Sequence, residues 1–500
     1  MRHCFRKSIA IAVLFGASAC GNAELSQPAL RAGPVRFSIA VQLGVAARTL
    51  VVNVRYRKQG GSDVSLAEQS IDVGSEVKQV PLSVDIAPCL ADPLREGAGD
   101  AAAGNACIVR VGLTLLGSAG ETLDKSETPP MVVRPGETAE ARLGIGARVS
   151  QMLLALGVSH SCRTITVGAG ATTCWGSNRN AQLGTVNRDT INTDVLVPQP
   201  LVVASLSSLD SEWQHTCGVT AAGAIQCWGA NFAGQLGEAP SGARPSPRNV
   251  AGLPVMKQVV VGSDFTCGVS VDGIAYCWGE NLWGALGDAT QGSRATPAPV
   301  KTTVRFTRLA AGFNFVCGIS TTGPLLCWGT LSGNPVPANI ALGPVQVPGS
   351  ELIRTASIAM GASHACALTD DGIALCLGRN EAGEIGDGTV IERLLPTPVA
   401  GGLRFSMLAA GARFTCGLAL DGQSYCWGLN SVGQLGDGTN ASRSVPTRVN
   451  GSLPFSIVAA GQSHVCAGTS GGVTYCWGSN VNGQLGDGTR TNRLVPTLVR

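Results

Sequence analysis

The sequence predicts an all-β protein in which a small β-sandwich of the immunoglobulin or fibronectin kind precedes a seven-bladed β-propeller. A cysteine-centred signature recurs at nearly constant spacing from residue 151 onward, and apolar and polar residues alternate in short runs before it. The composition, with 66 glycines, 26 prolines and 44% hydrophobic residues, is typical of many short strands and turns and too apolar for a disordered chain. The boundaries follow as a signal at 1–19, a linker at 20–33, the sandwich at 34–146 and the propeller at 151–500.

Residues 1–19 have the pattern of an export signal. A basic start precedes an apolar run at 8–19 that is too short to span a bilayer as a helix. Residues 17–20 (ASAC) leave two outcomes open, which are ordinary cleavage before Cys20 and lipidation of Cys20, because they resemble the bacterial lipobox. Cys20 is the one cysteine of the mature chain without a nearby partner, which favours lipidation. We expect a cell-envelope lipoprotein held at the outer membrane, with plain secretion as the alternative.

The region 34–146 shows the alternation that is typical of antiparallel strands with one buried face. Val35, Phe37 and Ile39 alternate with more polar neighbours, and similar runs occur at 80–86 and 109–115. Cys89 and Cys107 flank a loop rich in Gly, Ala and Asp, and we expect them to form a disulfide that staples it. The region carries no residues arranged for site chemistry, so it is interpreted as a spacer or adhesion module.

From residue 151 the chain repeats. The Cys-(Trp)-Gly signature begins at 174, 227, 277, 327, 376, 426 and 476, which gives a period near 50 residues and predicts one propeller blade per repeat. The array begins partway through a repeat. We therefore expect the last strand, within 494–500, to pair with the strands of 151–176 in one composite blade that closes the ring.

The last repeat also carries a family resemblance. Residues 461–466 (GQSHVC), 476–480 (CWGSN) and 483–488 (GQLGDG), together with Pro496, look like the repeat of the regulator of chromosome condensation. The resemblance covers 151–500 and implies a seven-bladed propeller. It also implies guanine-nucleotide exchange or chromatin binding as candidate activities. Secreted bacterial propellers that are similar to this one include an inhibitor of β-lactamases.

The cysteine spacing predicts a disulfide across one hairpin of every blade. In the third repeat a turn at Asp272 and Gly273 places Cys267 opposite Cys277 in a non-hydrogen-bonded pair, where Cα atoms lie about 4.5 Å apart. Reduced core thiols and a metal site are the alternatives, and a metal site requires closer cysteines or converging histidines. The predicted pairs are Cys162–Cys174, Cys217–Cys227, Cys267–Cys277, Cys317–Cys327, Cys366–Cys376, Cys416–Cys426 and Cys466–Cys476.

Alignment of the repeats assigns their histidine and tryptophan side chains to packing, with two exceptions among the tryptophans. One position holds His in four repeats and Phe in three, which indicates a core position rather than a proton-transfer site: His160, His215, Phe265, Phe315, His364, Phe414 and His464. A Trp after the second cysteine fills the wedge between blades in six repeats. Trp213 and Trp283 lie outside this register, so we expect them to contact a partner. Residues 330–343 depart from the repeat and indicate either drift or a loop specialised for a partner.

These observations favour a non-enzymatic binding protein with no cofactor and no metal. The net charge of +3 and 14% charged residues provide no basic patch for nucleic acid. We expect a monomer that holds a protein or glycan partner and touches the membrane only through its N-terminal lipid. The open alternatives are exchange-factor or chromatin-binding activity, an enzyme inhibitor such as a β-lactamase inhibitor, and an enzyme with polar residues clustered at the mouth of the ring.

Overall fold

The computed structural model describes the strand backbone between residues 35 and 144 and, in the propeller, residues 152–165, 171–184, 193–330, 341–350, 355–420, 422–451, 453 and 455–500. The predicted signal, Cys20, the Cys89–Cys107 disulfide and most of the divergent loop 330–343 lie outside the described residues or side chains. Among the described residues no helix is long and apolar enough to cross a membrane.

The N-terminal strands form two sheets, one of three strands in the order β4-β1-β8 and one of five. The second has the order β3-β2-β5-β6, with β7 paired to β5. The sandwich arrangement stays a prediction. The strands are β1 Val35–Gln42, β2 Thr49–Arg57, β3 Asp63–Asp72, β4 Lys78–Val84, β5 Cys107–Leu116, β6 Thr122–Glu127, β7 Met131–Val133 and β8 Thr138–Gly144.

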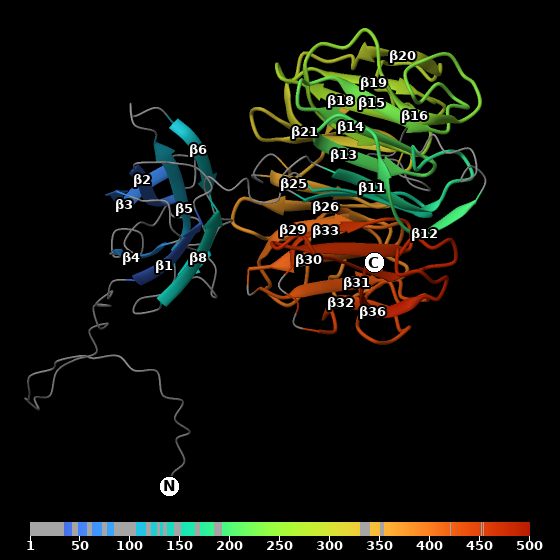
Figure 1. The fold of residues 1–500 in the computed structure, drawn as a ribbon. Coiled ribbons are helices and arrows are strands. Elements are labelled where there is room, and N and C mark those ends of the chain that lie inside the picture. The colour runs from blue at the N-terminus through green and yellow to red at the C-terminus, as the bar shows by residue number, and fades with distance from the viewer. Residues whose placement is uncertain are drawn as a thin grey trace, which may run out of the picture.

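Seven four-stranded antiparallel sheets follow, and each consists of four consecutive strands (Figure 1). The seven-bladed propeller is therefore confirmed. Blade 1 comprises β9 Met152–Leu156, β10 His160–Ile165, β11 Ala171–Ser177 and β12 Asp194–Leu201. Blade 2 comprises β13 Leu206–Glu212, β14 His215–Thr220, β15 Ile225–Gly229 and β16 Arg244–Asn249. Blade 3 comprises β17 Met256–Val261, β18 Phe265–Ser270, β19 Ala275–Gly279 and β20 Arg294–Pro299.

The remaining blades keep the same pattern. Blade 4 comprises β21 Phe306–Ala311, β22 Phe315–Ser320, β23 Leu325–Gly329 and β24 Ala341–Gln346, and blade 5 comprises β25 Thr355–Met360, β26 His364–Thr369, β27 Ala374–Gly378 and β28 Arg393–Pro398. Blade 6 comprises β29 Phe405–Ala410, β30 Phe414–Ala419, β31 Ser424–Gly428 and β32 Arg443–Arg448. Blade 7 comprises β33 Phe455–Ala460, β34 His464–Thr469, β35 Thr474–Gly478 and β36 Arg493–Leu498.

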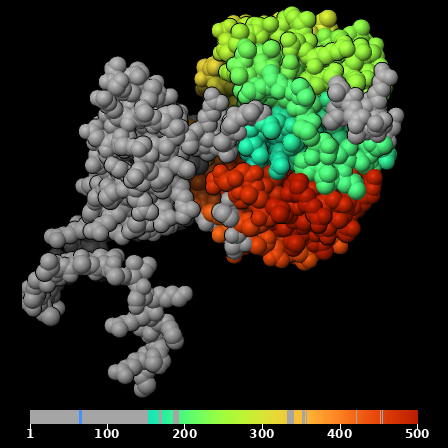
Figure 2. Space-filling view, viewed as in Figure 1, coloured from blue at the N-terminus to red at the C-terminus, as the bar shows by residue number. Residues whose placement is uncertain are grey.

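The predicted composite blade is wrong. Strand β36 pairs with β35 inside blade 7, and β12 completes blade 1, so no strand is exchanged between the two ends. Blade 7 lies directly against blade 1 (Figure 2), and side chains join them: Trp175 Nε1 donates to Gln484 O over 2.8 Å, and Ser161 Oγ lies 2.8 Å from His464 Nε2. The same two kinds of bond join other neighbouring blades, so the ring closes by repeating an ordinary blade interface.

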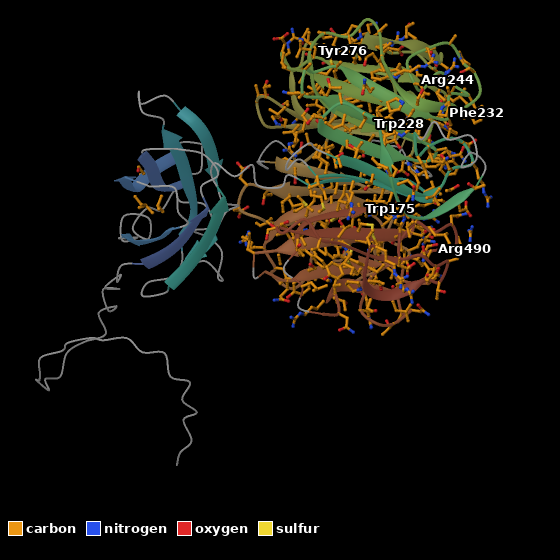
Figure 3. The ribbon with its side chains drawn as sticks, in the orientation of Figure 1. Trp175, Trp228, Phe232, Arg244, Tyr276 and Arg490 are labelled. Atoms are coloured by element: carbon orange, nitrogen blue, oxygen red, sulfur yellow. A yellow bond between two sulfur atoms is a disulfide. The ribbon has the colours of Figure 1, made fainter. Side chains whose placement is uncertain are left out.

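Each blade presents its loops on two faces. Successive strands run in opposite directions, so the loops after the first strand and after the third strand open on one face, which we call the loop face. The turns between the second and third strands, such as 271–273, open on the other, which we call the hairpin face. Phe232 and Arg490, both on loops after third strands, lie at the right edge of the propeller in Figure 3, whereas Trp175 and Trp228 lie within its body.

Candidate functional site

Disulfides close the central hairpin of every blade. Gly273, with φ of 79°, turns the hairpin of blade 3, Gly273 N donates to Ser270 O over 2.9 Å, and Cys267 pairs directly with Cys277. The seven disulfides match the pairs that the hairpin register predicts, and six of them have Cα atoms 4.1 Å apart and the seventh 4.2 Å. The structure therefore assigns these fourteen cysteines to staples, and disulfides of this number suit an extracellular or exported protein.

The four histidines are structural and bond across blade interfaces. His364 Nε2 lies 2.9 Å from Thr415 Oγ1 of the next blade, and the corresponding pairs are His160–Thr216, His215–Thr266 and His464–Ser161. Where the position holds Phe, the next blade has Val or Ala instead: Phe265 precedes Val316, Phe315 precedes Ala365, and Phe414 precedes Val465. Each interface therefore matches a donor with a hydroxyl, or an apolar ring with an apolar side chain.

Burial removes these histidines from acid–base chemistry. All four are at most 1% exposed, and burial lowers the pKa of His160 to about 3 and that of His364 to about 4. The pKa values of His215 and His464 fall to about 3 for the same reason. They are neutral at physiological pH and lack contact with solvent.

The signature tryptophans fill the wedges between blades and also donate a hydrogen bond that the sequence did not reveal. Trp427 Nε1 donates to Glu384 O of the preceding blade over 3.0 Å, and the same carbonyl accepts from Thr415 Oγ1 over 3.1 Å. A buried indole N–H requires such a partner. Six indoles are fully buried in this way: Trp175, Trp228, Trp278, Trp328, Trp427 and Trp477.

Blade 2 differs from the other blades in the residue at the end of its first strand, the inner strand, which lies nearest the axis of the propeller. Six blades place a glycine directly after or at the end of the inner strand: Gly157, Gly262, Gly312, Gly361, Gly411 and Gly461. None of the six has a positive φ, so space rather than backbone conformation requires glycine. A Cβ on Gly262 would lie 2.0 Å from Phe265 Cε1, and one on Gly361 would lie 2.6 Å from Gly411 O. Blade 2 has Glu212 at this position.

The backbone of blade 2 adapts to Glu212. Trp213, the next residue, has φ of 38°, a conformation that residues other than glycine rarely adopt and that is often found at functional sites. Its half-buried ring meets Phe313 of blade 4 edge to face, with ring centroids 5.2 Å apart. Phe313 occupies the same loop position in blade 4 that Trp213 occupies in blade 2. The two aromatic rings thus come together from blades that are not neighbours.

Glu212 and Phe313 both line a pocket on the axis of the propeller. It is small, with room for about one water molecule, and five blades line it with Glu212, Phe313, Met360, Gln462 and the glycines and alanines around them. The pocket opens on the loop face, since the lining residues end the inner strands or follow them. Sequence analysis predicted Trp213 but missed Glu212 and Phe313. An alignment of the repeats could have identified Glu212, because six repeats have glycine at this position and only this repeat has glutamate.

Two carboxyl groups of blade 2 have raised pKa values. Burial raises the pKa of Glu212 to about 8, with a further contribution from nearby Asp210. Burial also raises the pKa of Asp210 to about 7, although two backbone hydrogen bonds to its carboxyl group act to lower it. Asp210 is engaged in structure, because Oδ2 accepts from Val261 N of blade 3 over 2.8 Å and Oδ1 from Ser211 N over 3.0 Å. Glu212 alone faces the pocket.

The loops of blade 3 on the loop face carry further acidic and apolar side chains. Asp264 lies two residues after Gly262, and Glu280 N donates to Asp264 O over 2.8 Å. Burial raises the pKa of both carboxyl groups, and Asp264 adds to the shift of Glu280. Leu282 and Trp283 follow on the same loop and are 58% and 45% exposed. Trp283 is therefore on the loop face, as a partner contact requires.

Among the residues that the structure describes, no three His, Cys, Asp or Glu side chains are grouped to hold a metal ion. The side chains that do converge are the carboxyl group of Glu212, which accepts a backbone hydrogen bond from Trp213, and the ring of Phe313, against which Trp213 packs; the rest of the wall is largely backbone. Such an arrangement can bind a cationic or hydrogen-bonding group and orient it.

The fold and the repeated interfaces define a disulfide-stapled, seven-bladed β-propeller. Parts of its repeats are similar to the repeat of the regulator of chromosome condensation (RCC1): residues 272–319, 421–467 and 471–500 match one sequence model of the RCC1 repeat, and 256–282 and 356–384 match a second. No curated protein matches the sequence.

Several solved structures share the fold. The chain is 20% identical to human WBSCR16, with a TM-score of 0.60 over 66% of this chain and 94% of that one. It is 20% identical to yeast RCC1 (Prp20) in a complex with Kap60, with a TM-score of 0.60 over 70% and 84%. It is 21% identical to Prp20p from Saccharomyces cerevisiae, a structure described with its binding to Gsp1p and histones, with a TM-score of 0.60 over 70% and 87%.

Proposed function

We propose that this protein is an exported, non-enzymatic binding protein of the cell envelope that holds a polypeptide partner on the loop face of its propeller. The observation that carries the proposal is the set of departures from the repeat, which gather on one face: Glu212, Trp213 and Phe313 at the axis and Trp283 on the loop of blade 3. Loops on a rigid scaffold are the usual place for binding residues. The disulfides and the signal pattern at residues 1–19 support export, and lipidation of Cys20 would provide the anchor.

The enzymatic alternative needs at least two free groups at the mouth of the ring. The structure does place two carboxyl groups there, but both oxygens of Asp210 accept backbone hydrogen bonds. One remaining acid without a neighbouring nucleophile supports binding better than catalysis. No residue that lines this pocket favours nucleotide exchange or inhibition of a β-lactamase. The identity of the cross-linked partner in the experiment below would distinguish these two alternatives.

The experiment is site-specific photo-cross-linking in intact cells. A photoreactive residue replaces Trp283 on the loop face or, as the control, Val271 on the hairpin face, which is 55% exposed. The proposal expects one identified partner to cross-link from position 283 and not from 271. Capture of the same partner from both positions, or from 271 alone, would refute a loop-face function. A β-lactamase or a small GTPase captured from 283 would select the inhibitor or the exchange-factor alternative.

A further inference from the structure

We infer that the axial pocket binds the ammonium group of a lysine side chain presented by a polypeptide partner, with Glu212 as its counter-charge and Trp213 and Phe313 beside its aliphatic stem. The inference rests on the proposed function, since it names the chemistry of the partner. Four features of the pocket lead to it.

The first feature is the placement of Glu212 against the steric rule of the fold. Six blades use glycine at this position because a Cβ would collide with the neighbouring His or Phe ring or with the next glycine carbonyl. Blade 2 carries a full carboxyl side chain there and a Trp213 φ of 38° after it. Backbone strain of this kind is unfavourable by about 1–3 kcal/mol and is typical of binding sites. Packing alone gives no reason for this residue.

The second feature is the lack of an internal counter-charge. No described cation forms an ion pair with Glu212 or Asp210. The basic residue on the same type of loop, Arg413, is already paired with Glu384 over 3.1 Å and with Glu381 over 3.3 Å. A partly buried carboxylate that lacks a counter-charge is unfavourable. A cation from outside would supply the missing charge.

The third feature is the aromatic pair. A cation close to the face of an aromatic ring is attracted by the ring's quadrupole, and lysine places apolar methylenes against such rings while its ammonium reaches further. Trp213 and Phe313 meet edge to face, and Phe313 lines the pocket together with Glu212. A lysine that entered the pocket beside Phe313 would meet the carboxyl group of Glu212, which lines the same pocket.

The fourth feature is the wall of the pocket, which favours lysine over other cations. The wall contains Gly312, Gly361, Gly411 and Gly461, and a Cβ on any of them would lie 2.5–2.7 Å from the next glycine carbonyl. Backbone of this kind suits a compact ammonium with three rotatable donors on a narrow stem. A guanidinium is wider and planar, and a divalent ion requires more carboxylates than one. Asp264 and Glu280 extend the acidic surface outward, so the residues around the lysine are expected to be basic or neutral.

The test uses the full folded protein and short peptides with blocked ends: oligolysine, the same peptide with every side-chain amine acetylated, and oligoarginine, with cadaverine as the free amine. Affinity is measured by calorimetry for the wild type, Glu212→Gln, Glu212→Gly and the control Glu238→Gln. Glu238 is on the outer part of the same blade and pairs with Arg244. Glu212→Gly restores the residue of the other six blades, so it is expected to fold even if Glu212→Gln does not.

The expected result is saturable binding of oligolysine that weakens about 10- to 100-fold in both Glu212 variants and is unchanged in Glu238→Gln. Oligoarginine and cadaverine are expected to bind more weakly than oligolysine, and the acetylated peptide not at all. Because the pKa of free Glu212 is about 8, binding at neutral pH should release protons and tighten as the pH rises toward 8. Equal binding of the acetylated peptide, or oligolysine affinity that Glu212→Gly leaves unchanged, would overturn the inference.

The failure of this inference is distinguishable from the failure of the proposed function. If a partner still cross-links from position 283 in Glu212→Gly, the loop face binds and the lysine pocket is wrong. If no partner cross-links from position 283 but oligolysine binds in a Glu212-dependent way, the pocket is supported and the assignment of a polypeptide partner to the whole face is wrong.

Discussion

The paired residues at the blade interfaces allow a quantitative test of how the ring is held together. Thr415 joins two partners: its Oγ1 lies 2.9 Å from His364 Nε2 and donates to Glu384 O over 3.1 Å. Because the hydroxyl proton goes to Glu384 O, His364 must donate through Nε2–H. His364 Nδ1 has no hydrogen-bond partner among the described residues. Removing the hydroxyl therefore leaves a buried imidazole with neither nitrogen satisfied.

The expected cost follows from these contacts. In Thr415→Val the carbonyl of Glu384 keeps the bond from Trp427, so the main loss is at His364, and an unsatisfied buried group costs about 1–3 kcal/mol. His364→Phe alone leaves the bond from Thr415 to Glu384 intact and should cost about 1 kcal/mol. The double variant recreates the Phe414–Val465 type of pair found one interface further on, so it should be more stable than Thr415→Val alone.

The assay is chemical denaturation of the four proteins of the double-mutant cycle under non-oxidising, non-reducing conditions that keep the disulfides intact. The expected coupling between the two positions is about 1–2 kcal/mol in favour of the matched pair. Strictly additive effects, or a double variant less stable than Thr415→Val, would refute the idea that each interface selects a matched pair. The Phe-containing interfaces would then need another explanation.

Three further predictions follow from the same contacts. Acid should destabilise the protein as the pH falls from 6.5 to about 3, because the unfolded histidines bind protons that the buried ones, with lowered pKa values, do not; in melts from pH 7 to 5 His364→Phe should reduce this loss, and an equal loss would contradict it. Glu212→Gly should remove a loss of stability that the wild type suffers as the pH rises from 4.5 to about 8, because only the unfolded Glu212 ionises in that range; the same pH dependence of the melting temperature in both proteins would count against the raised pKa. Replacing Cys267 and Cys277 together by Ala should cost about 2–3 kcal/mol for the loop they close, measured against wild type by denaturation, and no change would mean that the staple contributes nothing.

Much of the local structure was accessible before the fold was known. The constant spacing of the cysteine signature predicts seven blades, and the midpoint turn at Asp272 and Gly273 fixes the register that sets Cys267 opposite Cys277. Both depend on contacts between residues close in sequence, where alternation and turn chemistry act directly. The shared His or Phe position was correctly interpreted as packing, although its partner in the next blade was not visible.

The sequence by itself determined the number of blades, the hairpin register and the disulfide pairs, because the physical causes are local: strand alternation, turn residues and cysteine spacing. Only the tertiary structure decided how the ring closes. It uses complete blades and the His464–Ser161 pair in place of the expected exchanged strand, since blade 7 already offers blade 1 the same interface that holds the other blades. Only the tertiary structure also brought Glu212 and Phe313 into one pocket, because closure of the ring places every inner strand around a common axis, whatever their separation in sequence.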